Sequence, residues 1–474
     1  MKIHHVIGGV ETDSADGATY DDIDPYTRQS YATVARASAV DVDLAVTAAR
    51  KAFDEGPWPR MGFAERGRLL HKFADLMEAH ADELGDAEGR DMGKPIAAAS
   101  SHDVPRSASN FRFFADHARL AVAEAFPSDI GMHTYTRYES AGVVAAISPW
   151  NFPLMLATWK IAPALAWGNT VVLKPAEDTP RSAALIGRLA LEAGIPEGVL
   201  NVVLGFGDAG AVLTQDPRVD RITFTGSSVT GRAIAAAGAA HLTPVSLELG
   251  GKGSNLVFDD ADVDVAVDWS IRAAFSNTGQ VCLAGSRLYV QRGVYDEFLS
   301  RFVSAAEGLV LGDPSDPSTS IGPLASAKHH AKVVSYLDPS RLGGGSVITG
   351  GVAEDWFVRP TVLTGVSADA AVQREEVFGP IVTVTPFDAE EDGVRLANDS
   401  PYGLSAMVFT EGLNRAHRVA AELRSGNVWV NCFFVRDLRA PFGGVGDSGW
   451  GREGGNFSRE FFTEPKTVSV RVGA

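Results

Sequence analysis

Residues 142–175 contain the pattern that indicates the fold class, and their sequence is GVVAAISPWNFPLMLATWKIAPALAWGNTVVLKP. GVVAAI (142–147) and NTVVLKP (169–175) are short runs rich in β-branched residues, as in buried strands. LMLATWKIAPALA (154–166) lies between them and is apolar enough to cover a sheet. Because strands joined by a helix of this length pair in parallel, we predict a βαβ unit here.

The same alternation continues along the chain, with a second covering helix at 181–193 and another α/β stretch from about residue 262. Upstream, apolar residues at helical spacing predict mainly amphipathic helices over the first hundred or so residues. The fold class is therefore α/β, with a doubly wound, nucleotide-binding-like first half. Further strands are expected at VLNVVLG (199–205), RITFTG (221–226), PVSLELG (244–250), SRLYVQ (286–291), PIVTVTPF (380–387), SGNVWVN (425–431) and TVSVRV (467–472).

The composition is that of a globular protein with an acidic surface. The chain has 474 residues, and 42 Lys and Arg against 59 Asp and Glu give a net charge of −17. This charge repels phosphate backbones and anionic membranes, so we expect neither nucleic acid nor a membrane as partner. The two cysteines, Cys282 and Cys432, form no disulfide framework or metal cluster. No targeting segment or membrane span can be recognised in the sequence, so we expect a cytoplasmic protein. We also expect no bound metal.

Two glycine motifs follow predicted strands and are candidates for phosphate binding. GFGDAG (205–210) has the glycine spacing of a dinucleotide fingerprint, but no acidic residue ends a second strand about 20 residues later. A tight turn between a strand and a helix explains this glycine spacing equally well. FTGSSVTG (224–231) places Gly226 and Ser227 where a strand ends and a helix begins, and backbone N–H groups at such a point bind anions. Its plain alternative is a serine N-cap.

Three other side chains have the chemistry of a covalent catalyst. Cys282 lies among small and polar residues in SNTGQVCLAGSR, which suits an accessible thiol, although a buried structural cysteine is the alternative. Glu248 ends a strand in SLELGGKG and is either a buried carboxylate of raised pKa or a surface glutamate. Asn151 lies between Pro149 and Pro153 in a stiff loop that is either an oxyanion site or a plain turn. Together they indicate acyl chemistry beside a nucleotide.

These residues occur in motifs that resemble the aldehyde dehydrogenase superfamily nearly from end to end. The motifs, in family order, are SPWNFP, LKPAEDTP, FTGSSVTG, LELGGK, GQVC, EEVFGP and PFGGVGDSGWGREGG. The resemblance implies a Rossmann-like NAD-binding domain (1–117 and 139–248), an α/β catalytic domain (249–445) and a small β bridging element (118–138 and 446–474). It also implies a homodimer or homotetramer.

The resemblance assigns a role to each catalytic candidate. Cys282 would attack the aldehyde as thiolate, and Asn151 would hold the oxyanion together with the Cys282 backbone N–H. Glu248 would activate the water that hydrolyses the thioester. Its presence favours a free carboxylate product over acyl transfer to coenzyme A.

The resemblance also implies a set of residues around NAD. Lys174 and Glu177 would bind the adenine-side ribose, and a carboxylate there repels a 2′-phosphate, so NAD is expected rather than NADP. Gly226 and Ser227 would hold the pyrophosphate. The expected NAD-binding residues are Ile147, Trp150, Lys174, Glu177, Gly207, Gly226, Ser227, Glu376 and Phe378.

Three arginines are candidates for recognising the substrate. Arg436 and Arg439 precede the PFGG turn, and Arg106 lies on a helix expected to line the same tunnel. A pair of such arginines would clamp a carboxylate, although ion pairs with Asp437 and Asp103 are the structural alternative. The surrounding sequence resembles the muconic semialdehyde dehydrogenases, which implies a carboxylated semialdehyde from aromatic ring cleavage as substrate. A broad-specificity or betaine-type aldehyde dehydrogenase, and a catalytically silent scaffold, are the alternatives.

Overall fold

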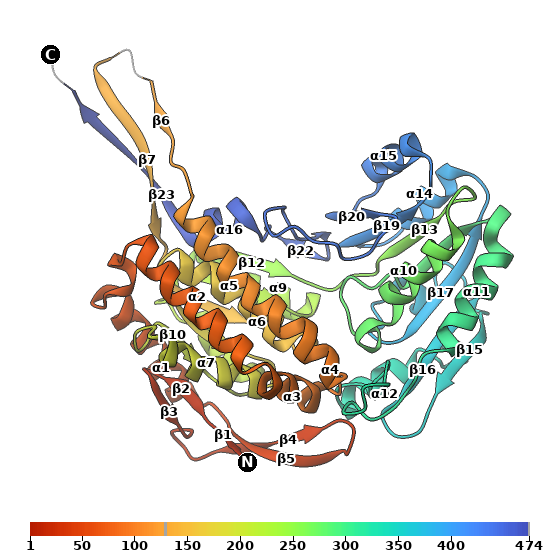
Figure 1. Cartoon of the computed structure of the whole chain (residues 1–474), viewed down its shortest axis with the longest axis horizontal. Helices are drawn as coiled ribbons and strands as arrows, with labels where there is room; N and C mark the ends of the chain where they lie inside the picture. Colours follow the sequence, from red (N-terminus) through yellow and green to blue (C-terminus); the bar gives the residue numbers. More distant parts are fainter. Residues whose placement is uncertain (128–129, 473–474) are drawn as a thin grey trace.

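Two large sheets and a projecting arm make up the molecule (Figure 1). The computed structural model describes residues 1–127 and 130–472. The first sheet has eight strands in the order β22-β12-β11-β8-β9-β10-β2-β3, and its central five strands are parallel. This arrangement confirms the predicted α/β class. The strands are β2 (His5–Ile7), β3 (Val10–Thr12), β8 (Val143–Ile147), β9 (Thr170–Lys174), β10 (Leu200–Val202), β11 (Arg221–Thr225), β12 (Val245–Glu248) and β22 (Gly449–Trp450).

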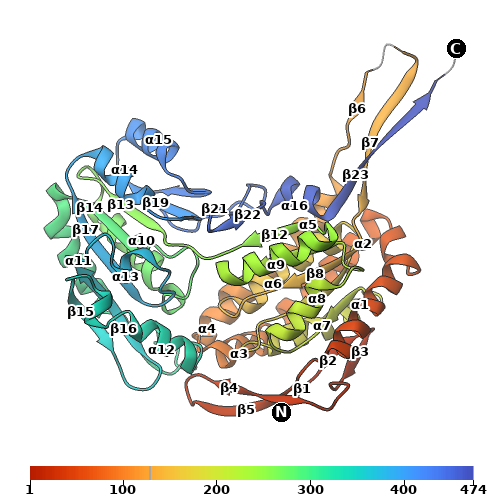
Figure 2. The ribbon, with the colours of Figure 1, turned by 180° about the vertical axis from the view of Figure 1, so that it is seen from behind.

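Helices cover both faces of the first sheet because each presents an apolar side to it. Figure 1 shows α2, α5, α6 and α7 on one face, and Figure 2, from behind, shows α1, α8 and α9 on the other. The predicted helix at 154–166 is α6, and its residues are buried almost throughout. These helices are α1 (Ala39–Asp54), α2 (Phe63–Ala79), α5 (Val104–Arg119), α6 (Pro153–Ala166), α7 (Arg181–Ala193), α8 (Gly207–Gln215) and α9 (Ser228–His241), with α3 (Ala81–Met92) and the short α4 (Ile96–Ala98) between α2 and α5.

The N-terminal segment differs from the expectation of mainly helices. The first helix begins only at Ala39, and the residues before it form strands. Two of these, β2 and β3, extend the first sheet, while β1 (Lys2–Ile3), β4 (Thr19–Asp24) and β5 (Gln29–Ala35) form a separate sheet. These strands pair at the rim of the domain, where only part of each strand is buried.

The second sheet has seven strands in the order β15-β16-β17-β14-β13-β19-β20. Helices α10 (Val263–Phe275) and α11 (Tyr295–Glu307) pack on one face, and α14 (Glu390–Asn398) and α15 (Leu413–Glu422) pack on the other. The strands are β13 (Ser254–Val257), β14 (Arg287–Gln291), β15 (Ser346–Val352), β16 (Val358–Thr364), β17 (Ile381–Phe387), β19 (Ser405–Phe409) and β20 (Asn427–Val430). The remaining short elements are α12 (Ala327–Ser335), α13 (Ala371–Arg374), β18 (Tyr402–Gly403) and β21 (Val445–Gly446).

The arm is a three-stranded antiparallel sheet in the order β23-β7-β6 that extends away from both large sheets (Figure 1). It consists of β6 (Ala125–Phe126), β7 (Met132–Ser140) and β23 (Thr463–Arg471). The C-terminal part of the arm is shorter than the expected bridging segment 446–474, because β22 joins the first sheet and α16 (Gly455–Phe462) packs on α6. In the part of the chain that the structure describes, no helix has the length and apolar character to cross a membrane.

Asn169 ties the arm to the first sheet, and its loss is expected to lower stability. Its side-chain amide donates to the Ala164 and Phe462 carbonyls at 3.0 and 2.9 Å, and its oxygen accepts from the Gly142 N–H at 2.9 Å. Asn169→Ala removes all three hydrogen bonds and leaves the buried Gly142 N–H unpaired, while the Ala164 and Phe462 carbonyls keep backbone donors at 3.0 and 3.3 Å, so we expect Tm to fall by about 3 °C or more in a thermal melt. Asn398→Ala, at two exposed hydrogen bonds, is the control and should change Tm by less than about 2 °C. Equal shifts would contradict the assigned role.

Candidate active site

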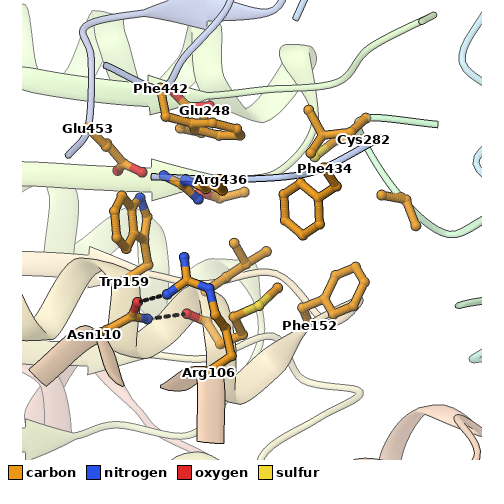
Figure 3. Close-up of a pocket in the computed structure, with 15 residues that line it drawn as sticks. Arg106, Asn110, Phe152, Trp159, Glu248, Cys282, Phe434, Arg436, Phe442 and Glu453 are labelled. Carbon is orange, nitrogen blue, oxygen red and sulfur yellow. Dashed lines mark hydrogen bonds between the residues drawn. The ribbon is translucent and has the colours of Figure 1, made fainter. Parts of the chain in front are cut away.

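A pocket between the two large sheets brings together residues from distant parts of the chain (Figure 3). Glu248 comes from the end of β12, and Cys282 from the loop before β14. Arg106 enters from α5, and Arg436 from the loop after β20. The other lining residues are Asn110, Phe152, Met155, Leu156, Trp159, Thr225, Val281, Leu283, Phe434, Phe442 and Glu453.

Cys282 is a half-buried thiol at the junction of this pocket and a second, longer groove. Burial raises the pKa of Cys282 to about 12, and the carboxyl groups of Glu376 and Glu248 add to the effect. At neutral pH the resting group is therefore the thiol, and a base must remove its proton before it can attack a substrate.

Glu248 is a buried carboxyl group beside that thiol. It is 5% exposed, and its Oε1 atom has no hydrogen-bond partner. Burial and the nearby Glu453 raise its pKa well above the usual range. Glu453 itself pairs with buried Lys160, at 3.1 Å between Oε1 and Nζ. Glu248 thus has the raised pKa and the free oxygen atom that a general base near neutral pH requires.

Asn151 is fixed against the loop that carries the thiol. Its Nδ2 atom donates to the Gln280 carbonyl at 2.9 Å, and its own carbonyl accepts from Asn277 Nδ2 at 2.8 Å. Asn151 and Cys282 line the same groove. The amide is therefore pre-positioned next to the thiol, as an oxyanion site requires.

The longer groove runs from Cys282 across the carboxyl ends of β8, β9 and β11. Glu376 and Phe378 line its part next to Cys282, and Trp150, Gly226 and Ser227 line both parts. Ile147, Lys174, Glu177 and Gly207 line the far part. The structure thus brings all nine expected cofactor residues into one groove.

The side chains of the groove have the donors and acceptors that a dinucleotide needs. Ser227 is the N-cap of α9 and accepts from the Thr230 N–H, so the N-cap and anion-site interpretations apply to the same residue. Lys174 Nζ lies 3.9 Å from the Glu177 carboxylate and donates to the Pro175 carbonyl. A cation, a carboxylate and a helix N-terminus suit ribose hydroxyls and a pyrophosphate. NAD fits this donor set.

Glu376 and Phe378 are held in place at the thiol end of the groove. Glu376 accepts from the Gly251 N–H at 2.8 Å. Phe378 has a left-handed backbone (φ 61°), and its carbonyl lies 2.7 Å from His329 Nε2. Burial lowers the pKa of His329 to about 4, so the imidazole is neutral and donates to that carbonyl.

The three candidate arginines do not share one location. Arg106 and Arg436 both line the thiol pocket. Arg439, in contrast, is exposed and pairs with Asp437 through contacts of 2.6 to 3.1 Å, so its position differs from the expected clamp. The expected alternative partner of Arg106, Asp103, is instead paired with Lys94. The ion-pair alternative therefore describes Arg439 and not Arg106.

Residues that line the site and that sequence reasoning missed include Asn110, Trp159, His329 and Glu453. Trp159 lies in an apolar helix, where it is indistinguishable from a core residue. Asn110 follows Arg106 by four positions, and this helical spacing could have suggested that the two side chains meet.

The raised pKa of Cys282 predicts how the protein reacts with an alkylating agent. Because only the thiolate reacts, we expect inactivation by iodoacetamide to accelerate roughly tenfold per pH unit between about pH 7 and 9. Cys282→Ser provides the control for labelling at Cys432. A rate that reaches a plateau within this pH range would mean that the thiol is more acidic than its burial implies.

Comparisons with known proteins agree with this geometry. The model of the aldehyde dehydrogenase family matches residues 12–468. A 2-hydroxymuconic semialdehyde dehydrogenase from Pseudomonas sp. (strain CF600) is 48% identical, over 99% of this chain and 100% of that protein. A 2-aminomuconic semialdehyde dehydrogenase from Danio rerio is 45% identical, over 95% of each chain.

Solved structures give the same result for the fold. An NAD⁺ complex of an aldehyde dehydrogenase from Bacillus cereus superposes with a TM-score of 0.97 at 40% identity, covering 100% of this chain and 97% of that one. A crystal structure from Burkholderia cenocepacia reaches the same score at 45% identity, covering 100% and 98%. The chain therefore belongs to the aldehyde dehydrogenase family, and it is an NAD-dependent oxidoreductase that acts on an aldehyde.

Proposed function

We propose that the protein oxidises a carboxylated semialdehyde of the muconic type to the corresponding dicarboxylate, with NAD as acceptor. The observation that carries this proposal is a pair of guanidinium groups, Arg106 and Arg436, beside the thiol. Among the described residues, no carboxylate lies within ion-pair distance of either. Two partly buried cations without an ion-pair partner favour an anion between them, and the substrate can supply it.

Arg436 has the free edge that a carboxylate would bind. Its guanidinium lies 3.9 Å from the ring centroids of both Trp159 and Phe442. Its Nε and Nη2 atoms are buried and have no hydrogen-bond partner. These two atoms form one side of the guanidinium, which matches the two oxygens of a carboxylate. Substrate binding would remove the cost of leaving both donors unpaired.

The charge on Arg436 also favours an anion. Burial lowers the pKa of Arg436 to about 9, and the positive charge of Arg106 contributes to this effect. Two like charges in one pocket repel each other, and a carboxylate between them would attract both. The names of similar proteins support this substrate class, since both relatives described above are named for muconic semialdehydes.

In the proposed reaction, the Cys282 thiol loses its proton to solvent, and the thiolate sulfur forms a bond to the aldehyde carbon. The resulting oxyanion is stabilised by Asn151 Nδ2 and the Cys282 backbone N–H. Bound NAD would supply the hydride acceptor for that carbon, and this oxidation would leave a thioester on Cys282. Lys174, Glu177, Gly226, Ser227 and Glu376 would hold the cofactor.

The task of Glu248 in this proposal is to activate water. It takes a proton as the water oxygen attacks the thioester carbon, the C–S bond breaks, and the thiolate leaves. The overall reaction consumes the aldehyde, NAD⁺ and water, and produces the carboxylate and NADH with release of two protons. Because Glu177 lies at the ribose end of the groove, NAD is proposed to be preferred over NADP.

We also propose that the protein is a cytoplasmic homodimer or homotetramer. The support is the projecting arm, whose strands β7 and β23 pair with each other far from the body (Figure 2). The side chains of Phe126 and Val470 on this arm are about half exposed. Light scattering on the full chain distinguishes an oligomer from a monomer, and a monomer would contradict this assignment.

Arg436→Met tests the substrate class. We expect kcat/KM for 2-hydroxymuconic semialdehyde to fall roughly ten- to hundredfold, because a charge-assisted hydrogen bond is worth about 1.5–3 kcal/mol. Oxidation of hexa-2,4-dienal, which has the same chain length but no carboxylate, should change little. Arg439→Met is the matched control and should leave both substrates unaffected. Equal losses on both substrates would favour a broad-specificity enzyme, with Arg436 in a structural role.

Glu248→Gln tests the hydrolytic step. We expect a burst of NADH followed by a slow steady state, because the thioester forms but water is no longer activated. Stopped-flow absorbance of NADH would measure the burst, and mass spectrometry of the quenched protein would identify the acyl group on Cys282. A normal steady state without accumulated acyl-enzyme would exclude Glu248 as the base for water.

A further inference from the structure

Arg106 is held by a neutral partner. Its Nη1 atom donates to Asn110 Oδ1 at 2.7 Å (Figure 3). It also makes a longer contact of 3.4 Å to Ser109 Oγ. Arg106 and Asn110 are one helical turn apart on α5, and both side chains line the pocket. The amide oxygen therefore fixes the direction of the guanidinium without cancelling its charge.

Asn110 is itself fixed from the opposite side. Its side chain is fully buried, and its Nδ2 atom donates to Thr158 Oγ1 at 3.0 Å and lies 3.5 Å from the Met155 carbonyl on α6. Thr158 Oγ1 in turn donates to the same carbonyl at 3.0 Å. These contacts identify the oxygen of the amide as the atom that faces Arg106. The orientation of Arg106 thus depends on a contact between two helices.

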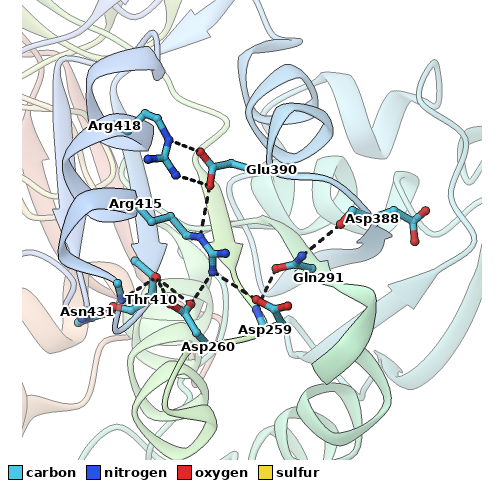
Figure 4. Close-up of polar contacts among 10 residues, drawn as sticks. Asp259, Asp260, Gln291, Asp388, Glu390, Thr410, Arg415, Arg418 and Asn431 are labelled. Carbon is cyan, nitrogen blue, oxygen red and sulfur yellow. Dashed lines mark hydrogen bonds and ion pairs between the residues drawn. The ribbon is translucent and has the colours of Figure 1, made fainter.

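Other arginines of this protein have carboxylates as ion-pair partners, unlike Arg106. On the molecular surface, Arg415 contacts Asp259, Asp260 and Glu390 at 2.7 to 3.2 Å, and Arg418 also pairs with Glu390 (Figure 4). These arginines are neutralised by their neighbours.

The carboxylate nearest to Arg106 in sequence, Asp103, already has another ion-pair partner. Asp103 lies three residues before Arg106 and is buried, but it pairs with Lys94, which holds the pKa of Asp103 below its usual value despite burial. Arg106 therefore has a defined direction and a charge without a counter-ion.

We propose that Asn110 is a positioning residue that determines specificity for carboxylated substrates, because it orients Arg106 through a neutral acceptor and leaves the positive charge to the substrate. This inference rests on the proposed function, in which Arg106 and Arg436 bind the substrate carboxylate. A carboxylate of the same size in place of the amide would pair with Arg106 and repel the incoming anion.

Asn110→Asp is the direct test, because the side chains have nearly the same shape. We expect kcat/KM for 2-hydroxymuconic semialdehyde to fall at least about tenfold, through a higher KM, while kcat/KM for hexa-2,4-dienal stays within about twofold. Ser109→Ala is the matched control and should change neither value, since the 3.4 Å contact of Ser109 is long for a hydrogen bond. Equal losses on both substrates would overturn the proposal and make Asn110 a structural residue.

Arg106→Met separates failure of this inference from failure of the proposed function. If Arg106→Met abolishes the preference for the carboxylated substrate and Asn110→Asp does not, Asn110 has no role in specificity. If neither Arg106→Met nor Arg436→Met alters the preference, the proposed substrate recognition is itself wrong. Should Asn110→Asp fail to fold in a thermal melt, Thr158→Val removes the anchor of Asn110 and should lower the same preference by about threefold. An unchanged preference in that variant would overturn the proposal.

Discussion

The parallel pairing of β8, β9, β11 and β12 is the constraint on which the site depends. Parallel strands end at the same edge of a sheet, so the loops that follow them must meet there. Asn151, Gly226 and Glu248 follow three of these strands and reach one edge from positions far apart in sequence. The second sheet adds Cys282 from across that edge. A site of this kind requires both sheets to keep their relative position.

The sequence predicted this central part well, because its signals are local and strong. The βαβ pattern at 142–175 has long apolar runs, and the structure places both strands and the helix within a residue or two of the predicted limits. The first 35 residues were predicted wrongly, since strands such as His5–Ile7 are too short for any periodicity. β2 also pairs with β10, almost 200 residues away, and pairing at that distance has no local signal.

In the candidate site, too, the sequence did not predict where every side chain lies. Arg436 and Arg439 are three residues apart in one loop, and no pattern indicates that one is buried between two aromatic rings and the other is exposed. The residues of the longer groove were named from the family resemblance, and several of them, such as Ile147 and Lys174, lie at strand ends, where direction follows from the backbone. Residues such as Trp159 contribute through the space between helices, which depends on packing that a single sequence does not show.

The pocket beside Cys282 contains two positively charged arginines, whereas the molecule as a whole is negatively charged. The net charge of −17 would repel the proposed anionic substrate at long range, and salt screens this field beyond roughly 8–10 Å. Inside the pocket, Lys160 neutralises Glu453, and the raised pKa of Glu248 reduces its negative charge. The charges of Arg106 and Arg436 are therefore in excess there. If the substrate is an anion, as proposed, these two partly buried arginines must attract it against the field of the whole protein, and the direction in which each guanidinium points then decides whether it can bind a carboxylate.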